Sequence, residues 1–248
     1  MKSKTKKIII ASASVALIGT VAIGTTMAYL TVNTNSKVNN FTFNSEAVKA
    51  ILIEPKWDGI VSYDENNTAV YAEKYNAAVT AGTYETAAEA VAADEELGMN
   101  IAENMIPGKS APKNPQVKNT GSAANGDVAE WVAVKVTYVY NGGTDAGKQL
   151  STADMANLNN VIEIDYDDTG AWIKGDTTDP SSTIYYYNKQ LDLGKTTTEL
   201  FTEVKVKEGA TKADLENAPN FSIKIEGYAA QADAYDDVTA FKADVTTF

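Results

Sequence analysis

Short hydrophobic runs, separated by Gly, Pro, Asn and Asp, occupy most of the chain after residue 37. The longest run covers residues 128–140, and both of its alternating faces are largely apolar, which is typical of a strand covered on both sides. Shorter segments predicted as strands are 40–53, 114–118, 161–166, 171–174, 183–187, 199–206 and 221–230. About eight antiparallel strands predict an all-β fold, a jelly-roll-like antiparallel β-sandwich over residues 38–248.

One Ala-rich stretch, residues 68–97, has a helical pattern instead. Thr86 and Glu89 have the spacing of a capping box, and Gly82 and Gly98 stand where helices are expected to end. We therefore expect two short helices inserted at the edge of the sandwich, because about thirty residues bury too little surface to form a domain alone. Two smaller helical turns are predicted at 152–158 and 211–217.

The first 28 residues have the organisation of a secretory signal peptide. Four lysines within the first seven residues precede an uncharged, mainly apolar stretch that ends in small residues at Thr26 and Ala28. We expect cleavage between Ala28 and Tyr29, which would leave residues 29–37 as an N-terminal linker and a secreted protein that contacts the membrane only transiently. An uncleaved membrane anchor is the alternative, since the uncharged stretch is just long enough to span a bilayer.

The composition excludes several kinds of chemistry. The 248 residues include no His and no Cys, and all 21 basic residues are Lys. Ser-His and Cys-His nucleophiles, disulfides and zinc sites made of imidazole or thiolate are therefore impossible. The net charge of −12 repels phosphate backbones, so nucleic acid is not an expected partner. We expect no enzymatic activity and no cofactor.

Two acidic groups are the only candidates for a metal site. Asp165 and Asp167, followed by Gly170, have part of the spacing of a calcium loop. A turn at 167–170 that joins the strands 161–166 and 171–174 into a hairpin is the favoured interpretation. Asp236 and Asp237 form the second group, for which a solvated acidic surface is the favoured interpretation.

Several short patches occur in a characteristic order along the chain. Around the expected cleavage site they are Ala-Tyr-Leu-Thr at 28–31, Asn-Asn-Phe-Thr-Phe at 39–43 and Ile-Glu-Pro-Lys-Trp-Asp at 53–58. Further patches are Asn-Met-Ile-Pro-Gly-Lys at 104–109, Val-Lys-Asn-Thr-Gly at 117–121 and Trp-Val-Ala-Val-Lys-Val at 131–136, followed by 187–191, 193–197, 200–201 and 230–232. Together they resemble the TasA/camelysin family of Gram-positive matrix and surface proteins.

This resemblance implies a jelly-roll subunit, matured by a SipW-type signal peptidase, that polymerises with copies of itself into biofilm matrix fibres. The segment freed by cleavage would add as a strand to an open sheet edge of the next subunit. Its side chains alternate as a strand requires, with Leu30, Val32 and Thr34 on one face and Tyr29, Thr31 and Asn33 on the other.

Two other functions remain open at this stage. The first is a monomeric surface module that binds Ca²⁺ through acidic loops, or glycans through aromatic side chains such as Tyr185, Tyr186 and Tyr187. Three consecutive tyrosines in a strand also serve both faces of a sheet, and this is the simpler interpretation. The second is a hydrolase built on a pair of carboxylates, although nothing in the sequence selects one pair among 33 acidic residues.

Overall fold

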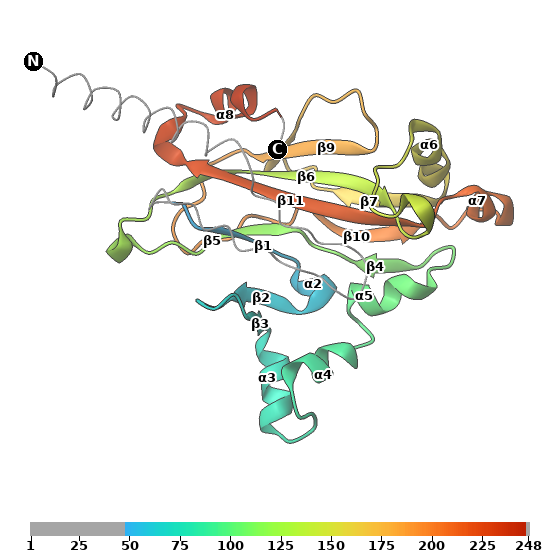
Figure 1. The fold of residues 1–248 in the computed structure, drawn as a ribbon, viewed down its shortest axis with the longest axis horizontal. Coiled ribbons are helices and arrows are strands. Elements are labelled where there is room, and N and C mark those ends of the chain that lie inside the picture. The colour runs from blue at the N-terminus through green and yellow to red at the C-terminus, as the bar shows by residue number, and fades with distance from the viewer. Residues whose placement is uncertain (1–47, 247–248) are drawn as a thin grey trace, which may run out of the picture.

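The computed structural model describes residues 48–246 (Figure 1). The predicted signal peptide, the expected cleavage site at Ala28 and Tyr29, the donor segment 29–37 and the first part of the predicted strand 40–53 lie outside the described residues.

The described chain is rich in β-strands, with short helices between them, which confirms the predicted β-rich fold. The strands are β1 (Ala50–Ile53), β2 (Ile60–Tyr63), β3 (Ala69–Tyr71), β4 (Ser110–Pro112), β5 (Gln116–Asn119), β6 (Glu130–Tyr140), β7 (Ile162–Tyr166), β8 (Trp172–Lys174), β9 (Ser182–Tyr187), β10 (Phe201–Val206) and β11 (Phe221–Gln231). The α-helices are α2 (Pro55–Asp58), α3 (Glu73–Thr80), α4 (Ala87–Ala92), α5 (Gly98–Ile101), α6 (Thr152–Val161), α7 (Lys212–Asn217) and α8 (Val238–Asp244).

The strands form several antiparallel sheets. The largest has four strands in the order β11-β6-β9-β8, and smaller sheets have the orders β4-β10-β7, β1-β5 and β2-β3. Residues 195–200, just before β10, run beside β5 and connect two of the small sheets. The Thr197 amide donates to the Val117 carbonyl at 2.9 Å, and the Leu200 amide donates to the Pro115 carbonyl at 3.0 Å. Strands β1, β5, β10 and β7 therefore form one continuous layer facing the four-stranded sheet.

The central strand β6 is buried on both faces, as its sequence predicts. Val132, Val134 and Val136 point into the main core between the layers. Trp131 and Ala133 point to the opposite face, where α8 covers them. Figure 1 shows α8 on the outer side of this sheet. The sequence pattern predicts both apolar faces of β6 but not the helix that covers one of them.

The three consecutive tyrosines of β9 are all buried, which confirms that they serve both faces of the sheet. Tyr185 and Tyr187 lie in the main core, whereas Tyr186 packs in the cluster under α8. Their exposed fractions are 6%, 2% and 2%. None of these rings is available to stack on a sugar.

The predicted insertion contains the two expected helices, α3 and α4, in an arm that extends away from the sheets (Figure 1). Thr86 and Glu89 form the predicted capping box at the start of α4, and Gly82 adopts a positive φ of 73° after α3. Two details of the prediction are wrong. Residues 69–71 form β3, because Asp64 caps a turn that pairs them with β2. Gly98 begins α5 instead of ending α4.

Gly98 is required at that position for a packing reason. A Cβ atom there would lie 1.7 Å from the Pro112 carbonyl oxygen and 2.6 Å from the Trp57 ring. No other residue permits this approach of α5 to β4 without a shift of the backbone.

The hairpin predicted across the turn at 167–170 is wrong. β7 pairs with β10, whereas β8 pairs with β9, so the turn carries the chain from one layer to the other. The Asp167 carboxylate stabilises it by accepting hydrogen bonds from the Thr169 and Trp172 amides at 3.1 and 3.2 Å. The turn chemistry is as predicted, but the strands on its two sides have partners that are distant in sequence.

Candidate functional site

The outer edge of β11 is the longest sheet edge in the described part of the chain that pairs on one side only. Within residues 48–246, β11 pairs with β6 alone. At one end of this ladder the Asn141 amide donates a hydrogen bond to the Asn220 carbonyl. At the other end the Ala232 amide donates to the Ala129 carbonyl. Hydrogen-bonded pairs alternate along an antiparallel ladder. The backbone groups of Ile223, Ile225, Gly227 and Ala229 therefore point away from β6.

The side chains of these outward-facing positions point into the main core. Ile223, Ile225 and Ala229 are 2%, 0% and 8% exposed. Gly227 lies between them and is buried, and among residues 48–246 no atom lies within 4 Å of a Cβ atom built there. In the described chain the edge thus combines outward-pointing peptide groups with apolar side chains and room for a side chain at Gly227.

A cavity of about 400 Å³ lies beside the first residues of β11. Phe221 and Ile223 form one wall, and Ala111 and Val204 from the opposite layer form another. Trp57 and Leu158 also line it, and its polar lining includes Lys113, Asn141 and Asn220. The cavity therefore offers apolar space between the layers at one end of the β11 edge.

A buried charge cluster borders this cavity. The Lys113 Nζ atom lies 2.7 Å from Glu54 Oε2, and the two side chains are 1% and 0% exposed. The same nitrogen lies 4.5 Å from the centre of the Trp57 ring. Burial raises the pKa of Glu54, although the Lys113 charge acts in the opposite direction.

Asp58 is the second acid of this cluster, one helical turn after Glu54. Its carboxylate accepts a hydrogen bond from the Ile60 amide at 2.9 Å. Burial is the main cause that raises the pKa of the Asp58 carboxyl to about 7. The sequence does not predict the cluster, because Glu54 and Lys113 are 59 residues apart and the patch at 53–58 that contains Glu54 gives no sign of Lys113 as its partner.

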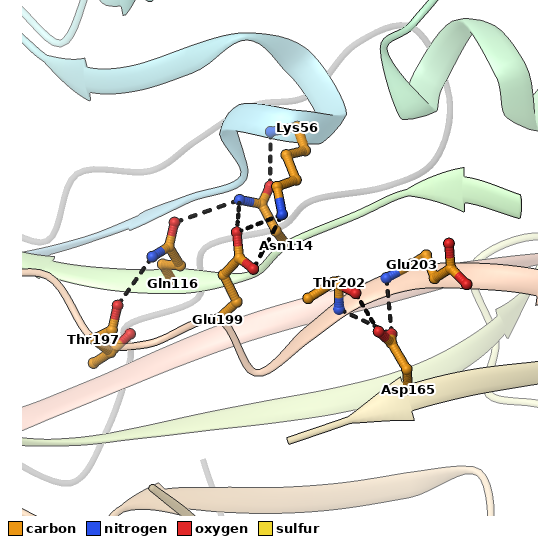
Figure 2. A network of polar contacts seen from close by, with 8 residues as sticks. All are labelled: Lys56, Asn114, Gln116, Asp165, Thr197, Glu199, Thr202 and Glu203. Atoms are coloured by element: carbon orange, nitrogen blue, oxygen red, sulfur yellow. Dashed lines mark hydrogen bonds and ion pairs between the residues drawn. The ribbon is translucent and has the colours of Figure 1, made fainter. Parts of the chain in front are cut away.

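An adjacent, more exposed polar network joins α2 to the segment before β10 (Figure 2). The Asn114 side chain accepts from the Lys56 amide at 2.7 Å and donates to Glu199 at 3.0 Å. The Lys56 Nζ atom lies 2.9 Å from Glu199 Oε1. Next to this ion pair, the Gln116 side-chain amide donates a hydrogen bond to the Thr197 carbonyl at 3.0 Å. These contacts fix the link between β4 and β5 in place.

Asp165, a calcium candidate in the sequence, holds a β-bulge. Its Oδ1 accepts hydrogen bonds from the Thr202 and Glu203 amides, both at 2.9 Å, and its Oδ2 accepts from the Thr202 hydroxyl (Figure 2). The register between β7 and β10 shifts at this point, between Phe201 and Val204. The Asp165 carboxylate therefore accepts the hydrogen bonds of two backbone amides that the bulge removes from the strand pairing.

Two of the other calcium candidates also have structural roles, and the third is exposed. Asp167 stabilises the turn described above, Asp237 caps the start of α8 by accepting from the Ala240 amide at 2.9 Å, and Asp236 is exposed. In the described part of the chain, no group of three or more acidic side chains is arranged to hold a metal ion. The structure does not bring the two acidic groups of the sequence together.

Comparison of the chain with models of known families, with curated proteins and with solved structures finds no match. Within residues 48–246, none of the helices has the length and apolar character needed to cross a membrane. Assignment of a function therefore depends on the geometry of the β11 edge and on the sequence.

Proposed function

We propose that this protein is an exported structural subunit that assembles into extracellular fibres of a biofilm matrix. In this proposal the two layers form a jelly-roll-like β-sandwich, and a strand from one subunit adds to the β11 edge of the next. The observation that supports it is the edge itself, where outward peptide groups, apolar side chains and the space at Gly227 coincide. An added strand would satisfy the peptide groups and fill the space.

The donor in this proposal is the segment 29–37 freed by cleavage after Ala28. One face of the donor, Leu30, Val32 and Thr34, would enter the core beside Gly227. Residues 38–47 connect the donor to the described chain and reach at most about 36 Å when fully extended.

The same proposal accounts for the rest of the sequence. A SipW-type signal peptidase would release the chain to the cell surface or matrix, as the resemblance to the TasA/camelysin family suggests. Cleavage would remove four of the 21 lysines and none of the 33 acidic residues, and the resulting net charge of −16 would keep subunits soluble until they assemble. Backbone pairing and apolar contact suffice for assembly, so the fibre would need no cofactor.

The direct test compares the protein starting at Tyr29 with a version starting at Val38, both examined by negative-stain electron microscopy at neutral and acidic pH. We expect filaments from the longer protein only. Filaments of equal yield from both versions would exclude the donor segment, and the absence of filaments from both under every condition would overturn the fibre proposal.

A pair of substitutions at Gly227 tests the acceptor edge. Gly227→Pro removes one outward N–H without breaking the ladder to β6, since proline is tolerated at an edge position whose N–H faces outward. Gly227→Ala is the matched control, because it adds a Cβ in the same open space and keeps the N–H. We expect the proline variant to remain folded and to form at least tenfold fewer filaments. Equal filament yields for the two variants would exclude β11 as the acceptor.

A further inference from the structure

The strongest unexplained feature of the described chain is the contact between Lys113 and Glu54. Glu54 lies between β1 and α2, whereas Lys113 lies in the link between β4 and β5. Both side chains are enclosed, and Nζ and Oε2 are 2.7 Å apart. The lysine nitrogen and the carboxyl group are therefore held in direct contact, as a condensation between them requires.

Burial makes the charged form of this pair costly, and it raises the pKa of Glu54. Separated from water, a buried ion pair loses hydration that its mutual attraction only partly replaces. The second carboxylate oxygen, Oε1 of Glu54, is buried without a hydrogen-bond partner among the described residues. A carboxylate with one unsatisfied oxygen is a poor permanent partner for a lysine, whereas an amide would bury neither charge.

We infer that Lys113 and Glu54 condense to an intramolecular isopeptide bond. A proton first moves from the Lys113 ammonium to the Glu54 carboxylate, giving an amine and a carboxylic acid. The Nζ lone pair then attacks Cδ, and collapse of the tetrahedral intermediate expels one carboxyl oxygen with two protons as water. The product is an amide between Nζ and Cδ, and the reaction needs no oxidant, reductant or additional reactant.

Burial also prepares the acid for this reaction. It raises the pKa of Glu54 and thus favours the carboxylic acid that the attack requires, although the Lys113 charge acts in the opposite direction. The ring of Trp57 lies beside the lysine and excludes water from it.

The bond would have a clear structural effect. It would join the end of β1 to the link between β4 and β5 and thereby close a covalent loop of 59 residues that contains the whole arm. The chain has no cysteine and hence no disulfide. An isopeptide bond supplies the same constraint on the unfolded state, and it resists reduction.

Digestion of the denatured wild-type protein with trypsin, followed by mass spectrometry, tests the inference directly. Trypsin cleaves after lysine, and an acylated Lys113 would block cleavage. We expect one branched species in which 50–56 is joined to 110–118, lighter than the sum of the two peptides by one water. Recovery of free 50–56 together with 110–113 and 114–118 would overturn the inference.

The chain supplies its own control for accidental condensation. Lys56 and Glu199 form a similarly close ion pair at 2.9 Å, but both are partly exposed to water. We expect no linkage between the peptides that carry them. If the Lys56 and Glu199 peptides are linked to the same extent, the effect does not depend on burial and the inference fails.

One variant separates chemistry from folding. Lys113→Arg keeps a positive charge but lacks the primary amine, so the branched species should disappear while cooperative unfolding in urea remains. A branched species in Lys113→Arg would exclude Lys113 as the nucleophile.

Discussion

Replacement of Glu130 by glutamine should stabilise the protein at alkaline pH and have little effect at acidic pH. Glu130 begins β6 and is fully buried. Its Oε1 accepts a hydrogen bond from the Lys49 amide at 2.5 Å, whereas Oε2 is buried without a partner among the described residues. Burial is the main cause that raises the pKa of this carboxyl from 4.5 to about 7, and the nearby Asp127 charge adds to it.

The sign of the effect follows from proton linkage. Between pH 4.5 and about 7 the folded protein keeps the Glu130 proton and the unfolded chain loses it. The free energy of unfolding therefore decreases as pH rises through this range, by about 1.4 kcal/mol for each pH unit. Above pH 7 the charged carboxylate destabilises the fold by about 3 kcal/mol. Glutamine has no charge and avoids this cost.

Urea denaturation of the wild-type protein and Glu130→Gln at pH 5 and pH 8 measures the difference. We expect similar stability at pH 5 and an advantage for the variant of about 3 kcal/mol at pH 8. Glu216→Gln, at an exposed position on α7, is the matched control and should show no pH-dependent difference. A variant that is no more stable than the wild type at pH 8 would refute the reasoning.

Three further predictions concern packing and hydrogen bonding. Phe241→Ala should lower the free energy of unfolding, measured by urea denaturation, by about 3–5 kcal/mol, because the fully buried ring packs against Trp131. A loss below about 1 kcal/mol would contradict the covering role of α8. Asp165→Ala should lower the free energy of unfolding by about 1–3 kcal/mol, because it leaves the two bulge amides unsatisfied. The loss should be the same in Ca²⁺ and in a chelator, and a loss that appears only with Ca²⁺ would instead indicate a metal site. Thr86→Ala should destabilise α4 by about 1 kcal/mol, seen as faster amide exchange confined to the arm, and unchanged exchange would contradict the capping role.

Local sequence patterns predict the elements whose signals are long or chemically specific. The strand β6 has the longest alternating pattern, and the start of α4 has a complete capping box, so both were predicted close to their observed positions. Strands β2 and β4 and helix α2 were missed because three or four residues are too few to show a periodicity. Helix α8 has a usable signal, since Asp237 is its N-cap, but the acidic residues around Asp237 favour the interpretation of a solvated acidic surface.

The errors in pairing and in the site have a common physical cause. The turn after β7 has the same chemistry whether its two strands pair with each other or with distant partners, and the distant pairings with β10 and β9 decide the outcome. Likewise, no local pattern indicates that Glu54 and Lys113 are buried together, even though Glu54 lies in the patch at 53–58. Their burial results from the packing of α2 and α5 against β4, which only the folded chain shows.

The helix α8 on the outer face of the four-stranded sheet limits how copies of this protein can associate. One face of the sheet is occupied by the core and the other by α8 around Phe241. Amyloid fibrils require bare sheet faces that interdigitate as dry zippers between neighbouring sheets. With both faces already covered, any assembly through this sheet would be restricted to its edges, and each copy would keep its own globular fold.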